Sequence, residues 1–266
     1  MSKIGCGSLT VVGTGMRAVA QLTLEARGAI EECDRLFHVV QDGLSRRFLD
    51  EARPGAESLA DSYARGKSRH ASYAEMVERV LAPVRAGERV CLALYGHPGV
   101  FATAGHEAVR RARAEGYPAT MLPGVSAADC LYADLGVDPG SRGCQSFEAT
   151  DFLVRHRRFD PTCHLLLWQV GALGVEDFRP GDGWNPAALG VLGRELAATY
   201  GEEHEGVIYE TPAYPIGEAR RERVPLGALA GAEVTLATTL YVPPLPEREL
   251  DAARLAELRA TIPGDA

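Results

Sequence analysis

Three side chains that could move a proton and hold a negative charge lie within eleven residues: Tyr63, Arg69 and Tyr73. A tyrosine can serve as a base, especially as a phenolate beside a cation. An arginine can stabilise an oxyanion, because it is a permanent cation with several hydrogen-bond donors. On residue types alone, the simpler interpretation is a polar surface loop with Lys67 and Arg69 solvated and Tyr73 packed on a helix.

A second stretch of interest is the loop Tyr-Gly-His-Pro-Gly at residues 95–99. It follows residues 90–94, an apolar run of strand formers that predicts a buried strand of a parallel sheet. Gly96, Pro98 and Gly99 favour a tight turn that lets a ligand approach the backbone closely. Ligands of open α/β sheets lie beyond the carboxyl ends of strands. The loop therefore predicts a binding site, and an ordinary strand-to-helix turn is the alternative.

Strands and helices alternate in the first half of the chain, which predicts a mostly parallel sheet. Strands are predicted over residues 8–12, 35–40, 90–94 and 119–122, helices over 22–33, 45–51, 72–86 and 104–115, and a polar loop over 58–65. Pro123 and Gly124 then mark a domain boundary. Beyond it, strands outnumber helices, which predicts a mixed sheet. Here strands are predicted over 146–150, 164–170, 206–210, 221–225 and 238–242, and helices over 126–135, 187–199, 226–230 and 247–261.

The sequence thus predicts an α/β protein of two domains. The N-terminal α/β domain covers residues 1–122, the C-terminal α/β domain covers 123–245, and a helical tail covers 246–266. We place the site that holds the reacting group of the substrate, the acceptor site, in the first domain.

Composition narrows the class of protein. Of the 266 residues, 46% are hydrophobic and 24% are charged, as in ordinary soluble proteins. The net charge is −8, and the only basic run is residues 155–158, so nucleic acid is not expected as the main partner. The cysteines form no Cys-x-x-Cys pair and the histidines have no metal-binding spacing, which favours reduced thiols and no metal. No long apolar segment begins the chain, so neither a signal peptide nor a membrane span is expected.

Five stretches together resemble one enzyme family. The loop over residues 95–101 resembles the central loop of the tetrapyrrole-methylase-type (class III) S-adenosylmethionine methyltransferases, and the whole run resembles the borosin peptide α-N-methyltransferases. The matching stretches are residues 7–15, 63–73, 95–101, 121–134 and 167–171. The similarity extends from about residue 7 to residue 244. It implies a tetrapyrrole-methylase-like fold with the cofactor cleft between the two domains.

The resemblance also implies a set of residues that bind S-adenosylmethionine. They are Tyr95, Gly96, His97, Pro98, Gly99, Val100, Phe101, Ser126, Ala127, Gln169, Val170 and Thr239. Aromatic faces and carbonyl oxygens suit a sulfonium, which is a soft cation. Val100 and Phe101 could instead belong to the core, and Ser126 could be only a helix cap. Gln169 follows a run of apolar residues, so it needs a polar partner if it is buried.

A backbone amide is a demanding acceptor for a methyl group, since its nitrogen lone pair is delocalised into the carbonyl. Methylation requires removal of the amide proton and stabilisation of the resulting imidate oxygen. The resemblance places Tyr63, Arg69 and Tyr73 at the catalytic centre, with Tyr63 as the base and the other two orienting and stabilising the acceptor. One further tyrosine of the fused relatives falls on Ala60 here, so the choice between the tyrosines stays open.

The partners follow from the same resemblance. In the fused borosin enzymes the chain continues into a clasp and a core peptide that becomes methylated, whereas this chain ends soon after Pro243 and Pro244. We therefore expect a separate precursor peptide as substrate, with a truncated chain as the alternative. The family also implies a homodimer, or a heterotetramer with the precursor, in the cytoplasm.

Two other functions remain open at this stage. One is C-methylation of a precorrin or sirohaem precursor. Most tetrapyrrole methylases carry a Gly-x-Gly-Pro-Gly-Asp-like turn where this chain has Met16 and Arg17 after Gly15, which argues against that substrate. The other is a catalytically silent partner that keeps the fold and binds peptide.

Overall fold

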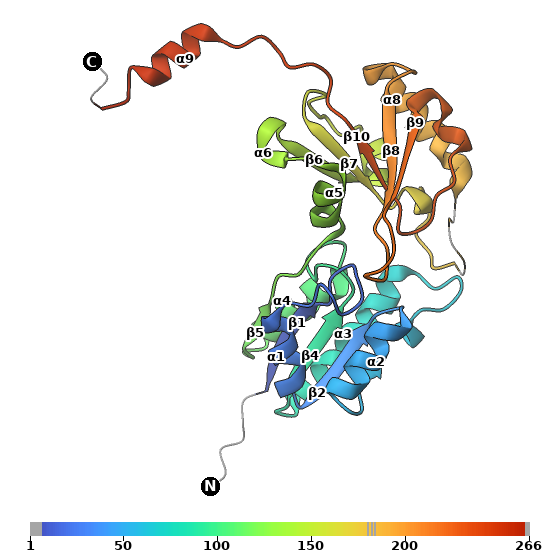
Figure 1. The fold of residues 1–266 in the computed structure, drawn as a ribbon. Helices are drawn as coiled ribbons and strands as arrows, with labels where there is room; N and C mark the ends of the chain where they lie inside the picture. Colours follow the sequence, from blue (N-terminus) through green and yellow to red (C-terminus); the bar gives the residue numbers. More distant parts are fainter. Residues whose placement is uncertain (1–6, 180, 182, 184, 264–266) are drawn as a thin grey trace.

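Two α/β domains lie end to end in the computed structural model, which describes residues 7–179, 181, 183 and 185–263 (Figure 1). Each domain is built around one five-stranded sheet, the first with strand order β3-β2-β4-β1-β5 and the second with order β6-β7-β10-β8-β9. The first sheet is parallel throughout and the second is mixed. The predicted fold class is confirmed.

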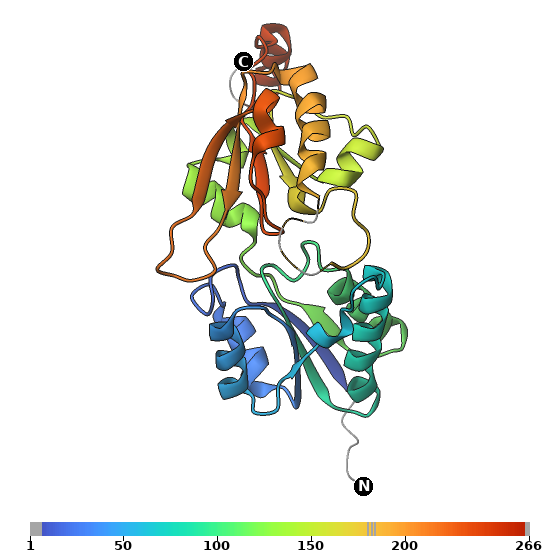
Figure 2. The ribbon, with the colours of Figure 1, turned by 90° about the vertical axis from the view of Figure 1, so that its right-hand side faces the viewer.

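The first sheet has helices on both faces (Figure 2). Its strands are β1 (Ser8–Gly13), β2 (Arg35–Val39), β3 (Glu57–Ser58), β4 (Arg89–Leu94) and β5 (Ala119–Met121). Its helices are α1 (Leu24–Glu32), α2 (Gly43–Ala52), α3 (Arg69–Arg85) and α4 (Thr103–Ala114), with a 3-10 turn η1 (Ala60–Ser62).

The alternation of side chains along β4 explains this layering. Val90 and Leu92 are buried in the cluster that includes α3 and α4. Cys91 and Ala93 are buried in the cluster that includes α1 and α2. Successive residues of a strand point to opposite faces, so an uninterrupted apolar strand needs helices on both sides.

The second sheet carries α8 on one face and α5 on the other. Its strands are β6 (Cys144–Glu148), β7 (His164–Trp168), β8 (Glu205–Glu210), β9 (Arg220–Pro225) and β10 (Thr239–Val242). Its helical elements are α5 (Ala127–Leu135), α6 (Pro139–Arg142), α7 (Ala149–Val154), α8 (Leu189–Tyr200), η2 (Val170–Ala172), η3 (Pro186–Ala188) and η4 (Leu226–Gly231). Leu165 and Leu167 of β7 pack on the side of α8, whereas Leu166 and Trp168 pack on the side of α5. As predicted, β9 is an edge strand.

Several segments differ from the sequence-based expectation. The strand predicted over 146–150 ends at Glu148, whose side chain accepts a hydrogen bond from the Asp151 amide at 2.7 Å and caps the unpredicted helix α7. The stretch predicted as a polar loop over 58–65 holds the end of β3 and the turn η1, because backbone pairing with β2 needs no apolar pattern. The helix predicted from residue 72 begins at Arg69, where the Ser68 side chain accepts a hydrogen bond from the His70 amide at 3.2 Å. Arg69 and Tyr73 therefore sit on the first turns of a helix and not on a loop.

The helix of the tail is shorter than predicted. α9 (Ala252–Arg259) begins where the Asp251 carboxylate accepts a hydrogen bond from the Arg254 amide at 2.8 Å. None of its residues is buried, and the tail leads away from the second domain (Figure 1). Across the described part of the chain, no helix combines the length and the apolar character needed to cross a membrane.

Three glycine-containing loops touch at the carboxyl edge of the first sheet. Gly15 and Gly96 exchange backbone hydrogen bonds of 3.2 and 3.0 Å. A Cβ atom on Gly13 would lie 2.3 Å from the carbonyl oxygen of Gly96, and one on Gly124 would lie 3.1 Å from the same oxygen. Side chains are thus excluded where these loops meet, and the loops can approach one another only through glycine.

This packing predicts opposite effects for two glycine-to-alanine substitutions. Gly13→Ala should lower the free energy of unfolding by about 1–3 kcal/mol, because its Cβ forces the Gly96 carbonyl to move. Gly28→Ala lies inside α1 with nothing within 4 Å of the new atom, so it should raise stability by about 0.5–1 kcal/mol. Urea unfolding of both variants checks the pair. Equal midpoints would show that the loop contact carries no stability.

Candidate active site

The loop over residues 95–101 leaves apolar and aromatic surface uncovered at the end of β4. The side chains of Tyr95, Val100 and Phe101 are 43%, 41% and 47% exposed, so Val100 and Phe101 do not belong to the core. Phe101 has a φ of 51°, in the left-handed region that costs energy for a residue with a Cβ. Its ring lies 5.8 Å from that of Trp168, at the end of β7 in the second domain. The loop belongs to the first domain and thus also contacts the second.

The interior of this loop is fixed by its own hydrogen bonds. The Gly99 amide donates to Nδ1 of His97 at 2.9 Å, so in the neutral ring the hydrogen of His97 is on Nε2. Nε2 of His106 lies 2.9 Å from the Gly99 carbonyl oxygen. A Cβ on Gly99 would lie 3.2 Å from the His97 ring, and Pro98 is buried. The backbone of the loop is therefore held without help from a ligand.

Ser126 caps a helix, as its sequence position predicted. It forms a reciprocal capping box with Asp129, in which the Ser126 amide donates to the Asp129 carboxylate at 2.7 Å and the Asp129 amide donates to the Ser126 hydroxyl oxygen at 3.3 Å. Ala127 follows as the first residue of α5. A contact of Ser126 or Ala127 with the cofactor remains a prediction.

The predicted residues of the second domain occupy three different environments. Gln169 adopts the left-handed backbone conformation with a φ of 57°, directly after β7. Val170 is fully buried in the core of the second domain, so its predicted contact with the cofactor stays a prediction. Thr239 is buried at the start of β10.

Arg69 supplies the polar partner that Gln169 was expected to need. One terminal nitrogen of Arg69 donates to Oε1 of Gln169 at 3.4 Å, and the other donates to the Val175 carbonyl oxygen at 2.9 Å. Its Nε donates to the Glu176 carbonyl oxygen at 3.2 Å. Since Arg69 belongs to the first domain and its partners belong to the second, this guanidinium links the two.

Backbone pairing reinforces this link. The Gly66 amide donates to the Phe178 carbonyl oxygen at 3.2 Å, and the Phe178 amide donates to the Lys67 carbonyl oxygen at 3.2 Å. Ser68 and Asp177 form an isolated antiparallel bridge. The loop after β7 therefore reaches the start of α3 (Figure 2).

Tyr63 is enclosed by two aromatic rings. It stacks on Phe178 with ring centroids 5.2 Å apart and planes at 23°, and it meets Tyr73 edge to face at 6.3 Å. Burial raises the pKa of Tyr63 well above its ordinary value, Tyr73 raises it further, and the Arg69 charge opposes both. Tyr63 is therefore a neutral phenol at neutral pH in this structure.

The structure brings together four of the predicted residues: Tyr63, Arg69, Tyr73 and Gln169. Sequence reasoning missed Phe178, because it lies in a stretch without periodicity. Its one signal is an aromatic residue between the charged Asp177 and Arg179.

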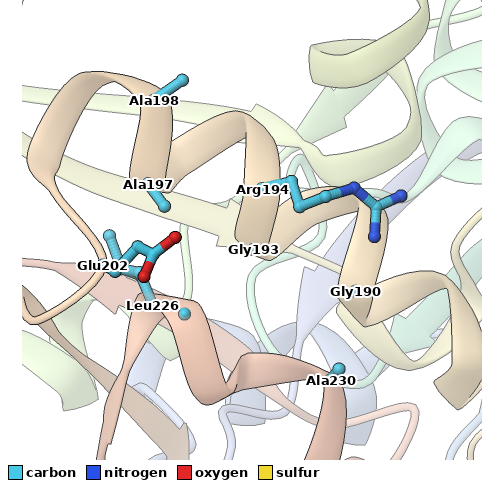
Figure 3. A pocket seen from close by; sticks show the side chains of 9 residues that line it. Gly190, Gly193, Arg194, Ala197, Ala198, Glu202, Leu226 and Ala230 are labelled. Carbon is cyan, nitrogen blue, oxygen red and sulfur yellow. The ribbon is translucent and has the colours of Figure 1, made fainter.

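Two cavities lie away from this junction. A cavity of about 340 Å³ on the second domain lies between α8 and η4, with Arg194 and Glu202 among glycines and alanines (Figure 3). Close packing explains its small residues, since a Cβ on Gly193 would lie 2.7 Å from the Leu226 carbonyl oxygen. A second cavity of about 470 Å³ lies between α4 and the edge strand β5. Among the described residues, no group of three or more acidic, histidine or cysteine side chains could hold a metal ion.

Comparison with known proteins identifies the family. The family model described as tetrapyrrole (corrin/porphyrin) methylases matches residues 8–167, which contain the first sheet and the loop over 95–101. This chain belongs to the tetrapyrrole methylase family. The resemblance predicted from the five sequence stretches is confirmed.

Similar curated proteins of this methylase family are fungal. One from Coprinopsis marcescibilis, a methyltransferase/ribosomally synthesized type I borosin cyclic peptide precursor, is 41% identical over 90% of this chain and 62% of its own length. The methyltransferase/omphalotin A precursor of Omphalotus olearius is 39% identical over 95% of this chain and 62% of its own. This chain thus spans about 62% of the length of these relatives.

Solved structures share the tetrapyrrole methylase fold at low sequence identity. Uroporphyrin-III-C-methyltransferase from Thermus thermophilus has a TM-score of 0.62 and 21% identity, over 91% of this chain and 98% of its own. A cobalt precorrin-4 methyltransferase has a TM-score of 0.63 and 18% identity, over 89% of this chain and 94% of its own. At this identity the likeness establishes the fold and not the substrate.

The exposed ring of Phe101 predicts a loss of cofactor affinity on its removal. We expect Phe101→Ala to weaken binding of S-adenosylmethionine by about tenfold, which corresponds to one aromatic contact of about 1.4 kcal/mol. Isothermal titration calorimetry measures the change. Val191→Ala is the control, because Val191 is similarly exposed at 49% but lies on α8. Equal affinities of all three proteins would exclude Phe101 from the cofactor site.

Proposed function

We propose that this methylase uses S-adenosylmethionine to methylate backbone amide nitrogens of a precursor peptide. The observation that supports this most directly is the hydrogen bond between Arg69 and Gln169, at 3.4 Å. It joins the cluster of Tyr63, Tyr73 and Arg69 to the end of β7, where Trp168 meets the loop over 95–101. Acid-base groups and the aromatic loop are therefore neighbours at one domain junction.

The residues of the loop fit the proposed cofactor. Residues 95–101 contain aromatic rings, backbone carbonyls and no lysine or arginine, so nothing in the loop repels a sulfonium. When bound, S-adenosylmethionine would supply an electrophilic methyl group, and S-adenosylhomocysteine would be the product that leaves. The positive charge of Arg69 is stabilised by the dipoles of the two carbonyl groups that accept its hydrogen bonds in the second domain.

The acceptor side supplies groups suited to an amide. Tyr63, once ionised, would take the proton from the amide nitrogen, and the negative charge would move to the amide oxygen. Arg69 is the permanent cation beside Tyr63, so it would stabilise that oxygen. Tyr73 meets Tyr63 edge to face and would orient the acceptor with it. Holding the nitrogen about 3 Å from the methyl carbon would supply much of the rate.

The named relatives guide the proposal for the substrate. Their names join a methyltransferase to a ribosomally synthesised peptide precursor, which supports a peptide as acceptor. We propose that a precursor supplied as a separate molecule can also enter the junction and be methylated. The proposal also includes a homodimer, or a heterotetramer with that precursor, and a cytoplasmic location. These parts rest on the family resemblance alone.

Co-expression with a precursor peptide tests the function. Fragmentation mass spectrometry should show mass increments of one methylene, localised to backbone nitrogens. Tyr63→Phe should still fold and bind cofactor and should lose most methylation, by about 100-fold or more. Arg69→Ala should lose as much, and because it also removes three hydrogen bonds to the second domain, its stability and cofactor affinity are measured with its rate. Tyr214→Phe and Arg65→Ala are matched controls, since both side chains are exposed, and they should keep the wild-type rate.

Other results would lead to different functions. Methyl groups on side chains would retain a methyltransferase and remove the imidate mechanism. An absorbance change with a precorrin acceptor would indicate a tetrapyrrole C-methyltransferase. An unmodified peptide that binds to a cofactor-loaded protein would indicate a silent peptide-binding partner.

The raised pKa of Tyr63 predicts the pH dependence of methylation. Burial holds the pKa of Tyr63 above its ordinary value, so the phenolate fraction should increase about tenfold per pH unit through neutral and mildly alkaline pH. Single-turnover rates between pH 7 and 9 should rise accordingly with pH. A rate that is flat over this range would show that Tyr63 is not the base.

A further inference from the structure

A residue of the second domain covers the proposed base of the first. The Phe178 ring lies 5.2 Å from the Tyr63 ring, and the planes are nearly parallel at 23°. Tyr73 closes a second side, edge to face at 84°. Tyr63 is half-buried with two rings packed against it, so its freedom to turn is restricted.

Four hydrogen bonds from the first domain hold the backbone around Phe178. Its amide and carbonyl pair with Lys67 and Gly66 at 3.2 Å each. Arg69 donates to the carbonyl oxygens of Val175 and Glu176, at 2.9 and 3.2 Å. The position of Phe178 is therefore set by the same arginine that is proposed to stabilise the acceptor oxygen.

We propose that Phe178 is a positioning residue for Tyr63, and that residues 175–178 form a clamp through which the second domain completes the acceptor site. This inference rests on the proposed peptide methylation. The clamp fixes the Tyr63 ring and the Arg69 guanidinium relative to one another, because Tyr63 stacks on Phe178 while Arg69 donates to Val175 and Glu176 of the same short segment. Phe178 itself need not touch the peptide or the cofactor.

Ordinary packing is the competing explanation, and it predicts something different. A merely packed Phe178 would change stability when removed and would leave the rate constant and its pH dependence unaltered. A positioning Phe178 changes both, because the hydroxyl loses its orientation and the ring becomes solvated. Uncovering Tyr63 removes the desolvation that raises its pKa, so the pKa should fall toward its ordinary value.

The experiment compares Phe178→Ala with Phe178→Tyr, which keeps the ring, in single-turnover methylation of the precursor peptide. We expect Phe178→Ala to lower the maximal rate by about 10- to 100-fold, with the dissociation constant of S-adenosylmethionine within about twofold of wild type. Its rate should level off at a lower pH than the wild-type rate. Phe178→Tyr should restore most of the rate and the wild-type pH profile.

A control separates the general effect of losing a stacked ring from the specific effect of losing Phe178. Phe159 stacks on Tyr200 at 5.9 Å and 15° within the second domain, so Phe159→Ala removes a similar stack away from Tyr63. It should lower stability and leave the pH profile unchanged. An unchanged maximal rate and pH profile for Phe178→Ala would overturn the inference.

A readout that needs no activity distinguishes this inference from the proposed function. In nuclear magnetic resonance spectra, the Tyr63 ring protons, assigned with Tyr63→Phe, should carry a ring-current shift that Phe178→Ala removes and Phe159→Ala keeps. If wild type methylates no backbone nitrogen, the proposed function fails. Loss of the shift in Phe178→Ala would then still show that Phe178 stacks on Tyr63, which positioning requires, and an unaltered Tyr63 spectrum would refute the inference.

Discussion

The junction between the domains depends on the hydrogen bonds of the Arg69 guanidinium group. This group lies at the start of α3 in the first domain and donates to Val175, Glu176 and Gln169 in the second. Its planar fork of donors reaches several acceptors at once, which the single ammonium of a lysine could not reproduce. Two of the three acceptors are backbone carbonyls, so the contact depends mainly on the path of the chain after β7, and Gln169 supplies the one side-chain acceptor.

The sheets bring the partners of this contact into range. Every strand of the first sheet ends at the same edge, where the loops around Gly13, Gly96 and Gly124 can touch because they carry no Cβ. The carboxyl end of β7 in the second domain faces that edge, since Trp168 contacts Phe101. Two strand ends, one from each domain, therefore frame the site, in keeping with the general position of ligands in α/β proteins.

The enclosure of Tyr63 has two chemical consequences that oppose each other. Burial beside Phe178 and Tyr73 raises the pKa of the Tyr63 hydroxyl, so its phenolate fraction at neutral pH is smaller than that of a free tyrosine. The same burial makes the phenolate, once formed, a stronger acceptor for the poorly acidic proton of an amide. The positive charge of Arg69 opposes this rise in the pKa of Tyr63. A base that removes a proton from a weak acid needs a high pKa. The fold therefore makes the Tyr63 phenolate a strong base, although only a small fraction of Tyr63 is ionised at neutral pH.

The sequence by itself determined the class of fold, the two sheets, the loop after β4 and the helix cap at Ser126. Each follows from local pattern: apolar runs that alternate with helices, glycines where a turn is needed, and a serine three residues before an acidic partner. It also supplied the residue types Tyr63, Arg69 and Tyr73, although not their location on and beside a helix. Only the tertiary structure decided the contacts of Arg69 with residues up to 107 positions away and the stacking of Phe178 on Tyr63. Backbone carbonyls carry no sequence signature, and residues after β7 have no periodicity, so these contacts exist only once both domains have folded against each other.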